Sequence, residues 1–168
     1  MASAPVLLTL GYQQRALDEF LGMLVNASVD VLIDVRETAW SHKPGFSKST
    51  LACALEKRGI AYVHARFAGN PKRFRESAES QAECLRLYAE HLDADGTIIE
   101  MFDELVGRLL DAGKRVCLTC FERDPDDCHR GVLVERWREG RYGTVLHLGV
   151  DRTANGRRRV YPASKRSS

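Results

Sequence analysis

The sequence predicts an α/β protein, a three-layer sandwich in which a mostly parallel sheet of about five strands carries helices on both faces. Three observations favour this class. Short apolar runs alternate with amphipathic helical segments, which is typical of a parallel sheet. The run from Val29 to Val35 is apolar enough for a strand that is buried on both faces. Right-handed crossovers between such strands place helices on both sides.

The first half of the chain predicts three strands separated by two helices. Leucine and phenylalanine recur at helical spacing in the first helix. The second helix begins with a serine cap and ends before Gly59, where a left-handed residue is favoured. The expected elements are strand Val6–Leu10, helix Ala16–Leu24, strand Val29–Val35, a helix capped by Ser47 that runs to Arg58, and strand Ile60–His64.

The second half predicts a polar loop, three further helices and two further strands. Asp95-Gly96 separates the first two of these helices, and glycines follow the second and third. The expected elements are loop 65–76, helix Ser77–His91, a helix capped by Thr97 that ends near Ala112, strand Val116–Phe121, a helix from about Cys128 to Glu139, and strand Thr144–Leu148.

The chain of 168 residues has the length of one domain. We expect this domain to span residues 1–151. Residues 152–168 contain six basic side chains and no acidic one, which leaves 19 basic and 23 acidic side chains, a net charge of −4, in the rest. We expect this segment to be a flexible basic tail. Nucleic acid is the partner that such a tail would bind, through Arg157, Arg158 and Arg159.

The composition indicates a protein of the reducing cytoplasm. With 44% hydrophobic and 29% charged residues, the chain is neither disordered nor fibrous. Its longest apolar runs fall far short of the roughly 20 residues that a membrane span needs, so we expect no membrane association. The N-terminus lacks the features of a secretory signal. The five cysteines show no disulfide framework, and we expect free thiols.

Chemically distinctive residues follow the predicted strands. Ligands of open parallel sheets bind outside the carboxyl ends of the strands, so these residues are expected to meet at one edge. We assign ligand binding there to residues that follow the first and second strands, and to one arginine near the fourth. They are Gly11, Tyr12, Asp34, Arg36 and Arg130. The loop 41–46 contains two side chains that can be cationic and one aromatic ring. It is a candidate lid over an anion, and an ordinary solvated loop is the equal alternative.

The segment from Cys120 to Arg130 is the densest group of polar and sulfur-bearing side chains. It is predicted to connect a strand to a helix whose free N–H groups and dipole favour an anion. Asp124 is the expected cap of that helix, with Cys128 in its first turn. The dipole and nearby cations lower the pKa of the Cys128 thiol, whereas the neighbouring aspartates raise it.

Three interpretations of this segment compete. A reactive or anion-binding site is the one we favour, because polar groups converge at a helix start. A metal site formed by Cys120, Cys128 and His129 lacks an obvious fourth ligand and matches no standard zinc spacing, so we expect no metal and name no cofactor. The third interpretation is structural: a buried thiol beside a capped helix.

Seven short motifs resemble, in order, the domain-of-unknown-function family 488, a widespread group of small prokaryotic proteins. They are Thr9-Leu10-Gly11-Tyr12, Asp34-Val35-Arg36, Pro44-Gly45-Phe46, Gly59-Ile60-Ala61-Tyr62, Cys120-Phe121-Glu122, Cys128-His129-Arg130 and His147-Leu148. The amphipathic helix that follows the first motif, Leu17-Asp18-Glu19-Phe20-Leu21, belongs to the same pattern. The resemblance covers about residues 6–150. It implies an α/β fold and a prokaryotic origin, but no established reaction. It marks seven signature positions: Asp34, Arg36, Cys120, Glu122, Cys128, His129 and Arg130.

A fainter similarity links the chain to rhodanese-like sulfurtransferases. They share the Asp-Val-Arg strand end and a strand–cysteine–loop–helix unit. Their compact anion-binding loop after the cysteine is absent, and three aspartates follow Cys120 instead.

We therefore expect an enzyme that acts on a phosphate- or carboxylate-bearing, nucleotide-like substrate. The catalytic groups we assign to it are Cys120, Glu122, Cys128 and His129. Two alternatives stay open. One is a non-catalytic module that binds a nucleotide or nucleic acid, and the other is a rhodanese-like sulfurtransferase.

Overall fold

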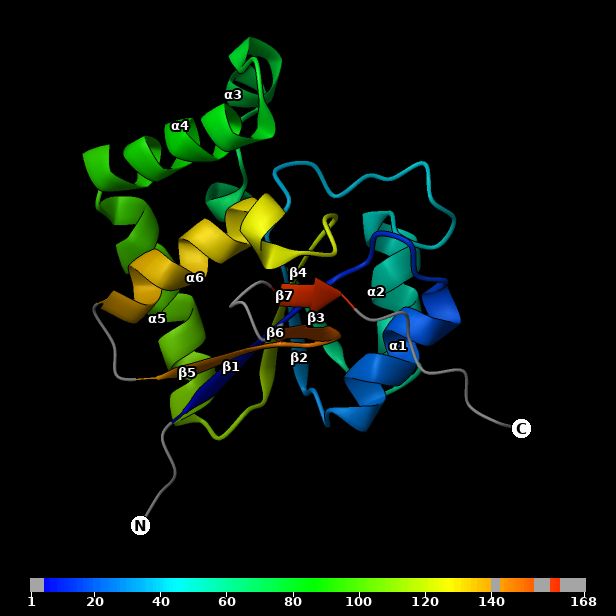
Figure 1. Ribbon diagram of the computed structural model, residues 1–168. Helices are drawn as coiled ribbons and strands as arrows, with labels where there is room; N and C mark the ends of the chain where they lie inside the picture. Colours follow the sequence, from blue (N-terminus) through cyan, green and yellow to red (C-terminus); the bar gives the residue numbers. More distant parts are fainter. Residues whose placement is uncertain (1–4, 140–142, 153–157, 161–168) are drawn as a thin grey trace.

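Five parallel strands form the centre of the molecule (Figure 1). The computed structural model describes residues 5–139, 143–152 and 158–160. The strand order is β3-β2-β4-β1-β5. The strands are β1 (Val6–Gly11), β2 (Val31–Asp34), β3 (Ala61–His64), β4 (Val116–Cys120) and β5 (Thr144–His147). The predicted parallel sheet of about five strands is thus confirmed.

Helices cover both faces of this sheet, as the sandwich prediction requires (Figure 1). One layer consists of α1 (Leu17–Asn26) and α2 (Lys48–Glu56). The other contains α4 (Gln81–Ala94), α5 (Thr97–Asp111) and α6 (His129–Glu139), and the short helix α3 (Lys72–Ser77) packs against α4.

Two apolar clusters hold the three layers together. Neighbouring residues of β1 point to opposite faces, so Leu7 belongs to the cluster under α4, α5 and α6, whereas Leu8 packs under α1 and α2. Both leucines are essentially inaccessible to solvent. Burial of a side chain of this size contributes about 1.5–3 kcal/mol. The near-continuous apolar character of the strands therefore follows from the presence of a helical layer on each face.

Two helix starts differ from the sequence prediction. The helix expected from Ser77 begins later as α4, because the Ser80 hydroxyl accepts the Glu83 N–H at 3.1 Å and caps it. Thr97 was expected as a cap, but it is the first residue of α5, and the Asp95 carboxylate accepts its N–H at 3.1 Å. Part of the expected polar loop 65–76 is helical: it contains a 3-10 turn (Arg66–Ala68) and the start of α3.

The C-terminal region contains a small antiparallel pair, β6 (Val150–Arg152) and β7 (Arg158–Val160). The strand β7 lies within residues 152–168, the segment that the sequence predicts to be a flexible tail, and the backbone of Arg158 and Arg159 pairs with β6. The domain boundary at residue 151 and the flexibility of the tail stay predictions. Arg157 lies outside the described residues, and nucleic-acid binding by this region stays a prediction.

None of the helices within the described ranges combines the length and the apolar character that a bilayer span requires.

The strand order creates a crevice above β1 and β4. These two strands are neighbours, yet the chain leaves β1 toward β2 and leaves β4 toward β5, in opposite directions. The connection from β1 passes β4 and leads to α1 on one face of the sheet, whereas the connection from β4 passes β1 and leads to α6 on the other face. Ligands of open parallel sheets bind at this carboxyl edge. The register pairs Gly11 with Cys120, so the chain segments that carry the candidate residues emerge side by side.

We expect Gly11→Ala to destabilise the fold at this crevice. A β-carbon at this position would overlap the backbone carbonyl of Glu122. The free energy of unfolding should fall by about 1–3 kcal/mol or more, because the backbone at Glu122, and not a flexible side chain, must move. Denaturant unfolding measures it.

The matched control is Gly22→Ala in α1, where nothing lies within 4 Å of the added carbon. Alanine favours helix over glycine by about 0.8–1 kcal/mol, so this variant should be neutral or more stable. Equal unfolding free energies for the two variants would contradict the proposed close approach.

Candidate functional site

A cavity of about 500 Å³ opens at the carboxyl edge of the sheet. It has two kinds of wall. Residues at or just after the strand ends and at the start of α6 form the inner wall: Tyr12, Arg36, Cys120, Phe121, Glu122 and His129. Residues of the loop after β2, and of the segment from Asn70 to Cys84, form the outer part: Glu37, Thr38, Trp40, Ser41, His42, Lys43, Asn70, Arg75, Gln81 and Cys84.

The structure brings five of the nine predicted site residues to this cavity and places four behind its wall. The five are Tyr12, Arg36, Cys120, Glu122 and His129. The four are Gly11, Asp34, Cys128 and Arg130, which are buried next to the cavity-lining residues. Each of these four has a local role that its contacts define.

The imidazole of His129 lies between two sulfur atoms and a backbone carbonyl. Its Nδ1 is 3.4 Å from Cys120 Sγ and 3.9 Å from Cys128 Sγ. Its Nε2 lies 2.8 Å from the Val35 carbonyl oxygen, which accepts only, so Nε2 carries the hydrogen. In the neutral ring the lone pair of Nδ1 therefore faces the two sulfurs.

A tight turn after β4 produces this convergence. Residues Pro125–Asp127 form a 3-10 turn whose cap is Asp124, which accepts the Asp126 N–H at 2.9 Å. The predicted cap is thus real, but it caps this turn and not the following helix. Cys128 has extended geometry and precedes α6, whereas the sequence analysis placed it in the first helical turn.

The two thiols and Glu122 have strongly altered proton affinities. Burial raises the pKa of Cys128, but its hydrogen bond with Cys120 and the charge of Arg130 outweigh burial and lower it well below the usual value. The same hydrogen bond, together with burial, raises the pKa of Cys120. Burial and the charge of Cys128 raise the pKa of Glu122 to about 7. The sulfur pair therefore favours a single negative charge, with Glu122 ready to hold a proton near neutral pH.

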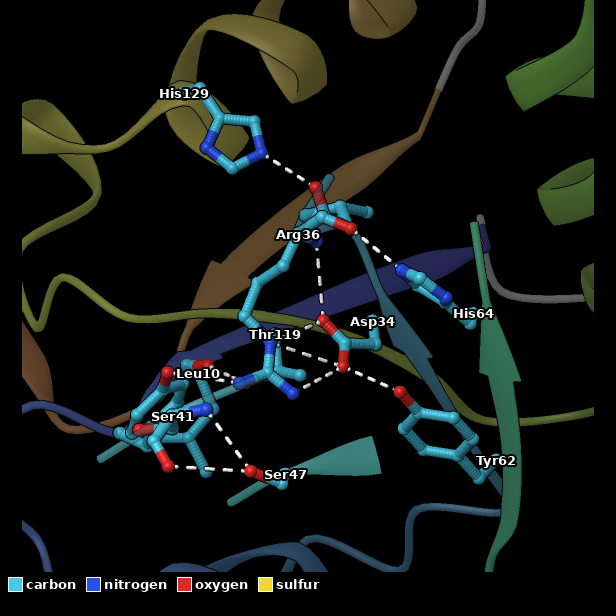
Figure 2. Close-up of polar contacts among 11 residues, drawn as sticks. Leu10, Asp34, Arg36, Ser41, Ser47, Tyr62, His64, Thr119 and His129 are labelled. Atoms are coloured by element: carbon cyan, nitrogen blue, oxygen red, sulfur yellow. Dashed lines mark hydrogen bonds and ion pairs between the residues drawn. The ribbon is translucent and has the colours of Figure 1, made fainter. Parts of the chain in front are cut away.

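Asp34 is hydrogen-bonded to Arg36, as Figure 2 shows. Its carboxylate is fully buried and accepts hydrogen bonds from Arg36 Nε at 2.9 Å, Arg36 Nη2 at 2.6 Å and the Tyr62 hydroxyl at 2.6 Å. Burial opposes the charge of Arg36, but the hydrogen bonds to Asp34 raise its pKa. Arg36 Nη1 also donates to the Tyr12 hydroxyl at 3.0 Å. Asp34 therefore fixes a permanent positive charge in the cavity wall.

Arg130 does not face the cavity. It is fully buried, and its guanidinium donates to the backbone carbonyls of Glu122, at 2.5 Å, and Arg123, at 3.1 Å. Its Nε donates to the Thr9 hydroxyl at 3.3 Å. These contacts use its donors to fix the loop after β4. The position of α6 under this loop explains why an arginine expected to clamp an anion instead supports Glu122.

Several cavity residues were missed by sequence reasoning. Trp40, 59% exposed, and Phe121, 43% exposed, are large apolar side chains beside the site. His42 and Lys43, by contrast, belong to the loop 41–46, for which the sequence already offers a role as a lid. Arg75 and Gln81 come from α3 and the start of α4, where no periodicity or motif indicated a functional position.

The buried ion pair gives a direct test of this architecture. Arg36→Met should lower the unfolding free energy by about 3–5 kcal/mol, because it leaves the Asp34 carboxylate buried without its cation. Tyr62→Phe is the matched control, since it removes one hydrogen bond to the same carboxylate and should cost about 1.5–3 kcal/mol. Chemical denaturation compares the two. A larger loss in Tyr62→Phe than in Arg36→Met would reject the assigned order.

Comparison with known proteins supports a family assignment. The family described as domain of unknown function DUF488 matches residues 16–137, which is more than half of the chain. No curated protein and no solved structure matches significantly, and a likeness to rhodanese-like domains is not shown. The match spans β2, β4 and the start of α6, which carry most of the cavity's inner wall. The chain belongs to the DUF488 family.

Proposed function

We propose that this protein is an enzyme that acts on an anionic, nucleotide-like substrate bound in the cavity. The observation that carries the proposal is the position of Cys120, Glu122 and His129 in the inner wall of a cavity whose outer part offers aromatic rings and cations. Cys120, Cys128 and His129 form what we call the sulfur–imidazole cluster. The cavity can hold a planar ring and an anionic group of the substrate while a reacting atom of the substrate lies at this cluster.

The aromatic part of the cavity suits a planar ring. Tyr12 stacks on Phe46 with ring centroids 4.5 Å apart, which holds Tyr12 rigidly in the wall. Trp40 and Phe121 have exposed faces that a base can cover. Stacking of a base on an aromatic side chain contributes about 1–3 kcal/mol.

The cationic groups suit a phosphate or carboxylate. Lys43 Nζ lies 3.1 Å from the Tyr12 carbonyl, and Arg75 lies 3.2 Å from the Glu37 carboxylate. Burial lowers the pKa of Lys43 from its usual value of about 10.4, which lies well above neutral pH. Both side chains line the cavity and can donate charge-assisted hydrogen bonds to an anion.

The inner wall supplies the reacting groups. Cys120 Sγ lies 3.6 Å from Glu122 Oε2 and 3.4 Å from His129 Nδ1, so two proton acceptors lie close to this cavity-lining sulfur. Glu122, with a pKa of about 7, can accept or donate a proton near neutral pH. Cys128 does not line the cavity, and its sulfur contacts the His129 ring from the buried side at 3.9 Å. The five free cysteines agree with the expected reducing, cytoplasmic location.

Calorimetric titration with a panel of nucleoside 5′-monophosphates and the matching nucleosides tests substrate binding. Arg75→Gln and Lys43→Gln should each weaken monophosphate binding about 10-fold or more, since a hydrogen bond to a charged group contributes about 1.5–3 kcal/mol. Nucleoside binding should change little. Trp40→Ala should weaken both ligand classes, because it removes the stacking surface.

Lys114→Gln is the control, because it removes an exposed lysine at the opposite edge of the sheet, just before β4. Chromatography of the same mixtures reports turnover, which Cys120→Ser should abolish while binding persists. Absence of binding across the panel at millimolar ligand would reject the proposal. Binding without conversion of any member would favour the non-catalytic module.

A further inference from the structure

We propose that Cys120, Cys128 and His129 together bind one Zn²⁺ ion whose fourth coordination position faces the cavity. The inference rests on the proposed function for the substrate, and it names the chemistry of the reaction centre. It follows from four features of the cluster: the spacing of its donor atoms, the orientation of the imidazole, burial with charge balance, and the side on which the cluster is open.

The three donor atoms have the spacing of a tetrahedral site. Cys120 Sγ, Cys128 Sγ and His129 Nδ1 all lie within 4.8 Å of one another. Zinc bonds of about 2.3 Å to sulfur and about 2.0–2.1 Å to nitrogen place tetrahedral sulfur and nitrogen ligands about 3.6 Å apart. The two sulfur–nitrogen distances, 3.4 and 3.9 Å, lie on either side of that value. Both sulfur–nitrogen pairs are therefore close to the separation that a tetrahedral zinc ion requires.

The imidazole is oriented as a metal ligand requires. Its Nε2–H donates to the Val35 carbonyl at 2.8 Å, which leaves the Nδ1 lone pair directed at the sulfurs. Metal-binding histidines almost always donate their second ring N–H to a carbonyl or carboxylate in this way. The Val35 carbonyl comes directly after β2, so the sheet itself fixes the ring.

Burial and charge also favour a dication here. All three side chains are nearly inaccessible, with exposed fractions of 5% for Cys120, 0% for Cys128 and 6% for His129. Two thiolates in such a place would be costly without compensation. One Zn²⁺ bound to both thiolates and a neutral imidazole gives a centre without net charge. The ion would thus bind all three donor atoms and compensate the negative charge of the two thiolates.

The open side of the cluster faces the substrate cavity. Cys120 and His129 line the cavity, and Cys128 closes the site from behind. Catalytic zinc sites use three protein ligands and keep the fourth position for water, as two cysteines and one histidine do in known cases. The missing fourth ligand, which counted against a metal in the sequence analysis, is therefore what a catalytic site requires.

Glu122 lies next to that open position. Its Oε2 is 3.6 Å from Cys120 Sγ, and its side chain lines the same cavity. A Zn²⁺ ion held by the two cysteines and the histidine would supply a Lewis acid that lowers the pKa of a bound water molecule. Glu122 would be the carboxylate placed to accept the proton from that water.

Cobalt substitution in the reduced full-length protein tests the site. Co²⁺ should bind with a stoichiometry of one, show the absorption of a tetrahedral thiolate-ligated ion, and be displaced by Zn²⁺. Cys128→Ser and His129→Gln should each weaken binding by at least about 100-fold, because even outer-shell changes cost about 10–100-fold. Cys53→Ser removes an exposed cysteine outside the cluster and should bind like the wild type.

The inference is overturned if the reduced wild type binds no stoichiometric metal, or if Cys53→Ser and His129→Gln bind metal equally. Circular dichroism of each variant shows whether a loss of binding reflects unfolding, and the wild-type stoichiometry decides if a variant does not fold. Glu122→Gln should keep the cobalt spectrum, and loss of the metal in this variant would contradict an open fourth position. Nucleotide binding without metal would reject the zinc site alone, whereas metal without nucleotide binding would reject the proposed substrate alone.

Discussion

The parallel pairing of β1 with β4 is the contact on which the site depends. The two strands remain paired beyond their ends, because Tyr12 N–H donates to the Cys120 carbonyl at 3.2 Å and Gln13 N–H donates to the Phe121 carbonyl at 2.8 Å. Only a residue without a side chain fits at Gly11 under the Glu122 backbone. The two chain segments therefore leave the sheet in contact and diverge only afterwards. That divergence produces the cavity and places Tyr12 opposite Glu122.

Buried arginines stabilise this edge in two different ways. Arg36 is neutralised by the Asp34 carboxylate and still reaches the cavity wall. Arg130 contacts backbone carbonyls instead, and its charge acts on the sulfur pair from behind. A buried charge is tolerated only with partners of this kind, and removal of one partner is costly. One arginine thus places a positive charge in the cavity wall, and the other holds the loop that contains Glu122.

The sulfur–imidazole cluster joins the end of a strand to the start of the helix that follows it. Cys120 ends a central strand, and Cys128 and His129 introduce the helix that packs on that strand. The 3-10 turn between them sets their separation, and the Val35 carbonyl of a third segment sets the ring orientation. Tyr88, with its ring centroid 5.2 Å from that of His129, closes the far side. A buried group of donors held from four directions is preorganised, which is what a reaction centre or a metal site needs.

The sequence by itself determined the sandwich, the approximate strand positions, and the edge at which Tyr12, Arg36, Cys120, Glu122 and His129 meet. Apolar periodicity depends only on neighbouring residues, so the sequence alone shows it. The rule that ligands bind at the carboxyl ends of parallel strands depends only on the order of strands and helices, so it too needs no coordinates. Gly59 and Gly113 illustrate the local part, because each ends a helix with the positive φ that glycine favours.

Only the tertiary structure decided which side chains face the cavity. The rotation of α6 on the sheet turned Arg130 inward, and the docking of α3 and α4 brought Arg75 and Gln81 to the opening. The same packing set the distances among Cys120, Cys128 and His129. Side-chain direction depends on how helices settle against a close-packed core, and that packing joins residues far apart in the chain, so no local pattern encodes it.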